Sequence, residues 1–166
     1  MRPFQRCLFL ASLIGVAVLC PSLVASKPKC AVTKPPEPAF VPPKPYSAFH
    51  GKDEFLYGTP GLWTIVDPKN WHVHSGGKLP FFREGFDWRK EGRPRLTVVA
   101  RRLDGEGPLV WNALVGSGSQ EGMGVEGMFM VTGIDVPSSG CWEITARYAA
   151  VEPEIQTLSY TVWVSN

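Results

Sequence analysis

Two histidines and two methionines have the types and spacing of a candidate metal site. His72 and His74 are two residues apart in a segment, Trp71–His74, that alternates apolar and polar residues as a strand does, so both imidazoles would lie on one face. Met128 and Met130 have the same spacing, and imidazole with thioether can bind copper or zinc. A half-exposed strand with methionines as core filler has the same pattern, so both interpretations stay open.

Arginines and aromatic residues between positions 81 and 102 form a second candidate site. Arginine and tryptophan often anchor interfaces, and arginine binds carboxylate or phosphate groups through two parallel hydrogen bonds. Such a patch could stack on sugars or hold an acidic polymer. The alternative is that the acidic residues among them neutralise the arginines while the aromatic rings fill the core. The candidate binding residues are Arg83, Trp88, Arg89, Arg93, Arg101 and Arg102.

The residue patterns that support catalysis are weak. Ser117 and Ser119 lie among glycines, and no serine has the Gly-x-Ser-x-Gly spacing of a hydrolase nucleophile. Carboxylate pairs such as Asp87 with Glu91 could flank a glycosidic bond, but ordinary surface charges have the same spacing. We therefore expect no enzyme, no catalytic residue and no cofactor.

The first residues of the chain resemble a secretory signal. Two arginines precede an apolar run over residues 8–19, and the small residues Ala25 and Ser26 offer a cleavage site. The run is too short to span a bilayer comfortably. We expect residues 1–26 to be a signal peptide and the mature chain to be secreted or periplasmic, with membrane attachment only if Cys20 is lipidated.

The charge of the chain gives no support for a nucleic-acid partner. The whole sequence has 17 basic and 15 acidic residues, but two of the basic residues would leave with the signal peptide. The mature chain is therefore close to neutral.

Only two cysteines remain after the expected cleavage, Cys30 and Cys141. In an oxidising compartment they can pair, and the bridge would join the start of the mature chain to a strand near its end. The alternative is that Cys141 is a buried free thiol. Sequence alone leaves both possibilities open, because nothing fixes Cys30 near Cys141.

A proline-rich segment precedes the folded region. Residues 27–45 contain seven prolines in nineteen positions, which excludes a helix or a central strand. We expect this segment to be a stiff linker that holds the domain away from whatever precedes it. The single folded domain would then cover residues 46–166, a size that can bury a real core.

Short strands separated by turns are predicted through the rest of the chain. Residues 55–66 read as one broken strand or two short ones, Arg95–Leu103 and Gly140–Tyr148 alternate cleanly, and Leu158–Val164 closes the chain. The glycine-rich stretch over residues 116–127 reads as a loop. Seven to nine strands without an amphipathic helix predict an all-β, immunoglobulin-like β-sandwich, with a closed barrel as the alternative.

Several motifs resemble a group of uncharacterised secreted or envelope proteins of bacteria. They are Phe82–Arg89, Pro94–Val98 with Arg101–Gly105, Gly140–Thr145 and Thr161–Val164. The resemblance covers most of the chain from about Phe55 onward. It implies an immunoglobulin-like sandwich outside the cytoplasm and no catalytic residue.

These observations together predict a non-enzymatic binding or structural module at the bacterial cell envelope, whose partner is an envelope protein or polymer. The alternative is a periplasmic copper- or zinc-binding protein that uses His72, His74, Met128 and Met130.

Overall fold

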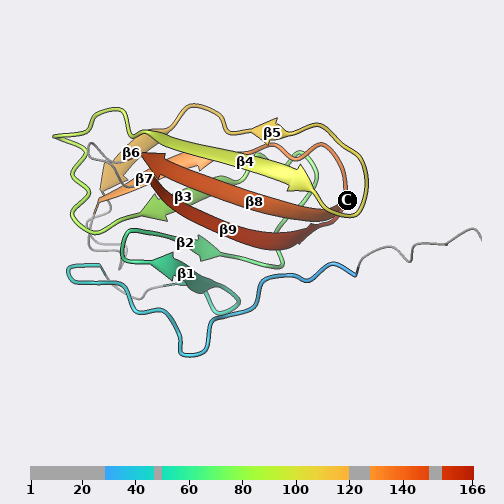
Figure 1. Ribbon diagram of the computed structural model, residues 1–166, viewed down its shortest axis with the longest axis horizontal. Coiled ribbons are helices and arrows are strands. Elements are labelled where there is room, and N and C mark those ends of the chain that lie inside the picture. The colour runs from blue at the N-terminus through green and yellow to red at the C-terminus, as the bar shows by residue number, and fades with distance from the viewer. Residues whose placement is uncertain (1–28, 47–49, 120–127, 150–154) are drawn as a thin grey trace, which may run out of the picture.

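The computed structural model describes residues 29–46, 50–119, 128–149 and 155–166. In these ranges the protein is all-β, and no helix that could cross a membrane occurs there. Two antiparallel sheets pack against each other (Figure 1). The strands are β1 (Phe55–Thr59), β2 (Leu62–Val66), β3 (Lys78–Phe82), β4 (Leu96–Arg102), β5 (Val110–Trp111), β6 (Gly116–Ser119), β7 (Met128–Gly133), β8 (Gly140–Ala149) and β9 (Ile155–Val164).

The order of the strands identifies the sandwich as immunoglobulin-like. One sheet has the order β1-β2-β3-β7-β6 and the other β5-β4-β8-β9. Strands β2-β3-β7-β6 and β5-β4-β8-β9 correspond to the A-B-E-D and C′-C-F-G sheets of immunoglobulin domains. Strand β1 is added at one edge by its hairpin with β2. The predicted fold class is confirmed, and residues 55–66 form two strands rather than one broken strand.

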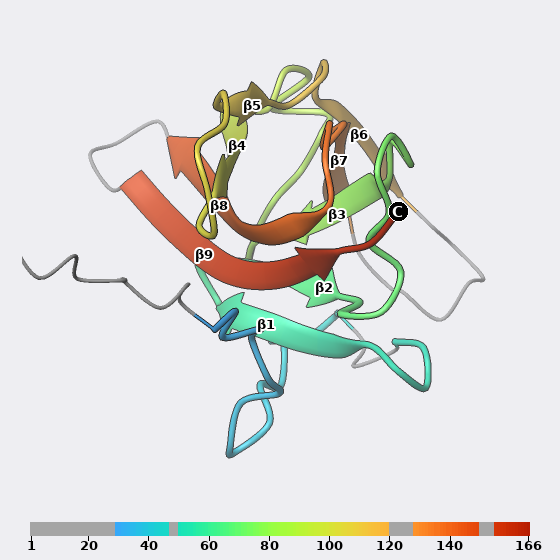
Figure 2. The same cartoon turned by 90° about the vertical axis from the view of Figure 1, so that its right-hand side faces the viewer.

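Alternation along the strands places the core between the sheets (Figure 2). In β8 the side chains of Trp142, Ile144, Ala146 and Tyr148 are buried. The intervening Glu143 and Arg147 face outward and are more exposed. Strands β4 and β9 alternate in the same way, as a half-buried strand requires.

The described part of the proline-rich segment lies against the sandwich, unlike the expected free linker. A disulfide joins Cys30 to Cys141, and the backbone N–H of Thr33 donates to the carbonyl of Thr161 in β9 at 2.9 Å. We call residues 30–46 the N-terminal strap. Its prolines suit a place beside an edge strand, where backbone donors are not needed. Disulfides of this kind form and persist in oxidising compartments.

Aromatic packing holds the far end of the strap on the outer face of the five-stranded sheet. The ring of Phe40 lies 5.8 Å from that of Trp63, and Tyr46 meets the same ring edge-on at 5.0 Å. Trp63 also stacks on Phe82. These residues form a second apolar cluster with Leu56. A polyproline stretch alone would remain extended, but these contacts give the strap apolar surface to bury.

Two local expectations differ from the structure. Trp71–His74 is not a strand, because the backbone of His74 has a positive φ of 54° and His72 makes only an isolated bridge with Ser165. Gly116–Ser119, expected as loop, is strand β6. The ring of Phe129 covers Gly118, where an added Cβ would meet it at 3.1 Å. An aromatic side chain thus compensates for missing bulk in this strand. Residues 120–127 of the expected loop lie outside the described ranges.

Candidate binding face

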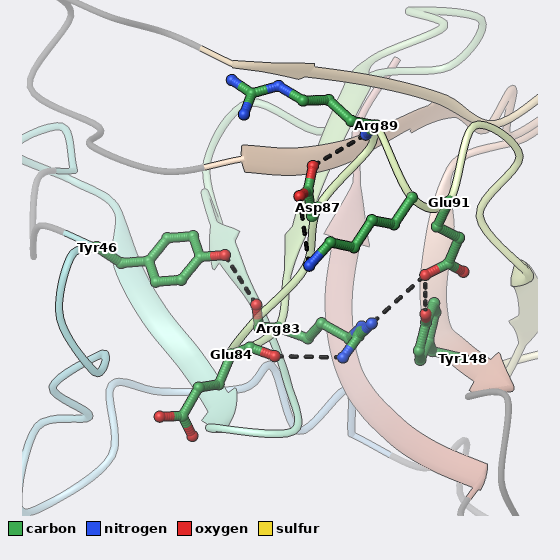
Figure 3. A network of polar contacts seen from close by, with 8 residues as sticks. Tyr46, Arg83, Glu84, Asp87, Arg89, Glu91 and Tyr148 are labelled. Carbon is green, nitrogen blue, oxygen red and sulfur yellow. Dashed lines mark hydrogen bonds and ion pairs between the residues drawn. The ribbon is translucent and has the colours of Figure 1, made fainter.

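A partly buried polar network contains the first residue of the predicted arginine patch. Figure 3 shows Arg83 between the backbone of Glu84 and the carboxylate of Glu91. Its guanidinium lies 3.4 Å from Glu91 Oε2 and 5.0 Å from the ring centre of Tyr148. Tyr148 donates its hydroxyl to the same carboxylate oxygen at 2.5 Å. The backbone carbonyl of Arg83 accepts a hydrogen bond from Tyr46 at 2.9 Å.

This network ties the β3–β4 connection to the core. Burial and the hydrogen bond to Glu91 raise the pKa of Tyr148 to about 12, so the phenol is a neutral donor at ordinary pH. Arg83 Nε and Glu91 Oε1 are buried and have no hydrogen-bond partner within the described residues. The ion pair is largely shielded from solvent. The guanidinium of Arg83 therefore makes its contacts inside the fold and is not presented on the surface.

Arg102 is also engaged within the fold. Its Nε donates to Asp104 Oδ1 at 2.8 Å, and Nη1 donates to Ser138 at 3.2 Å. The hydrogen bond from Arg102 holds the pKa of Asp104 below its usual value. Gly140 has φ of 141°, and a Cβ there would lie 2.8 Å from Asp104. These contacts lie at the start of β8, and they engage the guanidinium of Arg102 within the fold.

The other four members of the predicted patch lie in two different places. Trp88, Arg89 and Arg93 are exposed on the connection between β3 and β4, with the guanidinium of Arg89 5.9 Å from the Trp88 ring centre. Arg101 instead lies on the outer face of β4, where its Nη2 contacts Glu143 Oε2 at 2.9 Å. Three aromatic residues of the same stretch are in the core, as the alternative interpretation expects. Phe81, Phe82 and Phe86 are buried.

The predicted metal ligands do not form a common site. His72 Nδ1 lies 2.8 Å from the Ser165 hydroxyl, and His74 Nδ1 lies 3.1 Å from Asp135. Both histidines are exposed, whereas Met130 is fully buried in the main core. The described ranges hold no group of three or more His, Cys, Asp or Glu side chains placed to bind a metal ion.

A hollow on the outer face of the four-stranded sheet brings together residues that sequence reasoning did not combine. We call it the sheet-face hollow. Its volume is about 340 Å³, and Ala149 and Ile155 close one end. Trp111, 62% exposed, and Ile155, 55% exposed, are among the largest apolar side chains in contact with solvent. The remaining lining residues are Arg95, Thr97, Val99, Trp111, Thr145 and Arg147.

Strand register explains why these residues meet. Val99 of β4 pairs with Trp111 on one side and with Thr145 of β8 on the other. Thr97 pairs with Arg147 in the next outward row, and the backbone of Ala149 donates to Arg95 one row further. Residues two apart on a strand are separated by about 7 Å along it. The indole and the two guanidinium-bearing residues therefore follow one another over about 14 Å.

The hollow has an excess of positive charge. Arg95 and Arg147 are exposed, and neither forms an ion pair with another described residue. The nearby Arg101 is neutralised by Glu143. The segment 150–154, which contains Glu152 and Glu154, lies outside the described ranges. The described residues of the hollow thus include a tryptophan, two threonines, of which Thr145 shares a hydrogen bond with Ser159, and two arginines without a described counterion.

The sequence contained a partial signal for this face. Arg95–Leu103 alternates between two faces in the sequence, and the structure shows which of them points outward. Val110–Trp111, in contrast, is only two residues long and has no periodicity to recognise. Comparison with known proteins adds no assignment, because no family model, curated protein or solved structure matches the chain.

Proposed function

We propose that this protein is a non-enzymatic binding module that works outside the cytoplasm, at the bacterial cell envelope, and that the sheet-face hollow is its contact surface. The observation that carries the proposal is the hollow itself. It exposes Trp111 on the same face as Arg95 and Arg147, which have no acidic partner among the described residues.

The energetics of that arrangement favour a binding role over a purely structural one. A tryptophan that is 62% exposed contributes little to the core, and large apolar side chains left in solvent often mark interaction sites. Trp and Arg are also the residue types that contribute most to binding free energy at interfaces. The disulfide between Cys30 and Cys141 supports the extracytoplasmic location.

The test is retention of the purified secreted chain on a washed bacterial cell-envelope fraction. The variant Trp111→Ala removes the aromatic wall of the hollow. Trp88→Ala is a matched control, because Trp88 is 41% exposed but lies on the β3–β4 connection. Thermal unfolding of both variants verifies that they fold.

We expect retention by the unmodified chain and by Trp88→Ala, and its loss in Trp111→Ala. Loss in Trp88→Ala alone would transfer the site to the arginine patch predicted from the sequence and overturn the assignment to the sheet face. Absence of retention by the unmodified chain would refute the binding role at the envelope.

A further inference from the structure

The ligand class follows from the three kinds of group that line the sheet-face hollow. Trp111 offers a flat apolar face, and Arg95 and Arg147 offer positive charge. Thr97 and Thr145 offer hydroxyls, of which that of Thr145 also shares a hydrogen bond with Ser159 at 2.8 Å. A sugar ring has an apolar face that stacks on indole and hydroxyls that pair with threonine, and a carboxylate accepts two hydrogen bonds from one guanidinium. We propose that the hollow binds a carboxylated glycan, a polymer of uronic-acid sugars. This inference rests on the proposed function.

The arrangement of the groups favours a polymer over a single anion. The pairs Val99–Trp111 and Thr97–Arg147 occupy successive outward rows of the sheet, and Arg95 lies in the row after them. The rows span about 14 Å along β4, which is longer than one sugar ring. The aromatic wall therefore holds one ring of the chain while the arginines hold the carboxylates of its neighbours.

The charge pattern separates a carboxylated glycan from a neutral one. On the same face the ion pair between Arg101 and Glu143 leaves no net charge, whereas Arg95 and Arg147 have no carboxylate partner among the residues described. Two exposed guanidinium groups attract an anionic chain and increase its local concentration. A neutral glycan would gain only the stacking and hydroxyl contacts.

The shape of the site separates a glycan from an anionic membrane. Insertion into lipid requires apolar side chains that protrude together from the surface. Trp111 instead lines a concave site whose floor includes two hydroxyl-bearing residues, and the most exposed apolar residue, Leu114, is not part of the lining.

The binding experiment uses tryptophan fluorescence and isothermal calorimetry of the secreted chain with polygalacturonate as the probe. Dextran is the neutral glycan, inorganic polyphosphate is the anion without sugar, and phosphatidylglycerol vesicles are the lipid surface. The test variant is Arg95→Gln with Arg147→Gln. Its matched control is Arg89→Gln with Arg93→Gln, which removes the same charge from exposed arginines of the β3–β4 connection.

We expect polygalacturonate to bind, with affinity about tenfold or more lower in the test pair and in Trp111→Ala. The control pair should change the affinity less than about twofold, since its only effect is long-range charge. Dextran should bind much more weakly than polygalacturonate.

Each of the following results would overturn the inference. Equal affinity for dextran would exclude a role for the carboxylates, and tight binding of polyphosphate without dependence on Trp111 would indicate a general anion site. Binding of vesicles but not of polygalacturonate would assign the face to lipid. If envelope retention depends on Trp111 and polygalacturonate fails to bind, the ligand class is wrong while the proposed function stands.

Discussion

The Cys30–Cys141 disulfide should provide much of the stability of the domain, although it lies at one end of the fold. The two residues are 111 positions apart, so the bond closes a long stretch of the chain into a loop. In the chain-entropy model a loop of about 100 residues stabilises the folded state by about 4.7 kcal/mol, because the unfolded chain loses conformational freedom. Measured values are commonly about 2–4 kcal/mol.

The native structure provides a reason to expect a value near the upper part of that range. The strap keeps other contacts when the disulfide is absent, namely the Thr33–Thr161 hydrogen bond and the packing of Phe40 on Trp63. The folded state should therefore persist in the reduced protein, and most of the effect should fall on the unfolded state. We expect a loss of about 3–4 kcal/mol in the free energy of unfolding.

The assay is urea unfolding of the oxidised protein with and without a dithiol reductant, followed by tryptophan fluorescence. With a slope of about 2 kcal/mol per molar urea, the midpoint should fall by roughly 1.5–2 M on reduction. The double variant Cys30→Ser with Cys141→Ser should match the reduced protein and be insensitive to the dithiol. A loss below about 1 kcal/mol would refute the reasoning, because the chain-entropy model gives several times that value for a loop of this length.

Three further perturbations test contacts inside the fold. Gly140→Ala should destabilise the protein by about 1–3 kcal/mol in urea unfolding, because φ is 141° and the new Cβ would press on Asp104. Gly76→Ala is the control, because φ is also positive there but the new Cβ would meet open space. The comparison separates the effect of backbone strain from that of the steric contact. Glu91→Gln should cost about 2 kcal/mol by the same measurement, since Arg83 and Tyr148 lose a charged partner; an unchanged midpoint would contradict the role of the network. The pKa of Tyr148 is raised from 10.0 to about 12, so Tyr148 ionises at lower pH in the unfolded state than in the folded state. Its contribution to the free energy of unfolding is therefore complete below pH 10 and is lost between about pH 10 and 12. In Tyr148→Phe, stability should fall less steeply over that window, and an identical slope would exclude the assignment.

The split of the arginine patch shows where sequence reasoning reached its limit. Alternation over Arg95–Leu103 separated Arg101 from the apolar residues that are buried, because the period of side chains in a strand is two. The sequence left open whether acidic residues neutralise the arginines, and the structure shows that Arg83 pairs with Glu91 and Arg102 with Asp104. Whether an arginine is free depends on which acidic group the folded chain brings to it, and that partner can be near or far in sequence.

The sequence by itself determined the fold class and the two faces of the long strands. The alternation predicted for Gly140–Tyr148 puts Trp142, Ile144 and Tyr148 on one face, and all three are buried. Burial of a period-two apolar set is the main force that fixes strand orientation. The candidate disulfide could also be named from the cysteine count, but with its alternative still open.

Tertiary structure alone decided the path of the strap and the composition of the hollow. Cys141 lies on the outer face of β8, yet it is only 1% exposed, because the N-terminal strap, which begins at Cys30, covers it. Trp111, Arg95 and Arg147 come from three separate segments that meet through the register of β5, β4 and β8. Register depends on long-range hydrogen bonds between strands, so no local pattern could place this tryptophan beside these arginines.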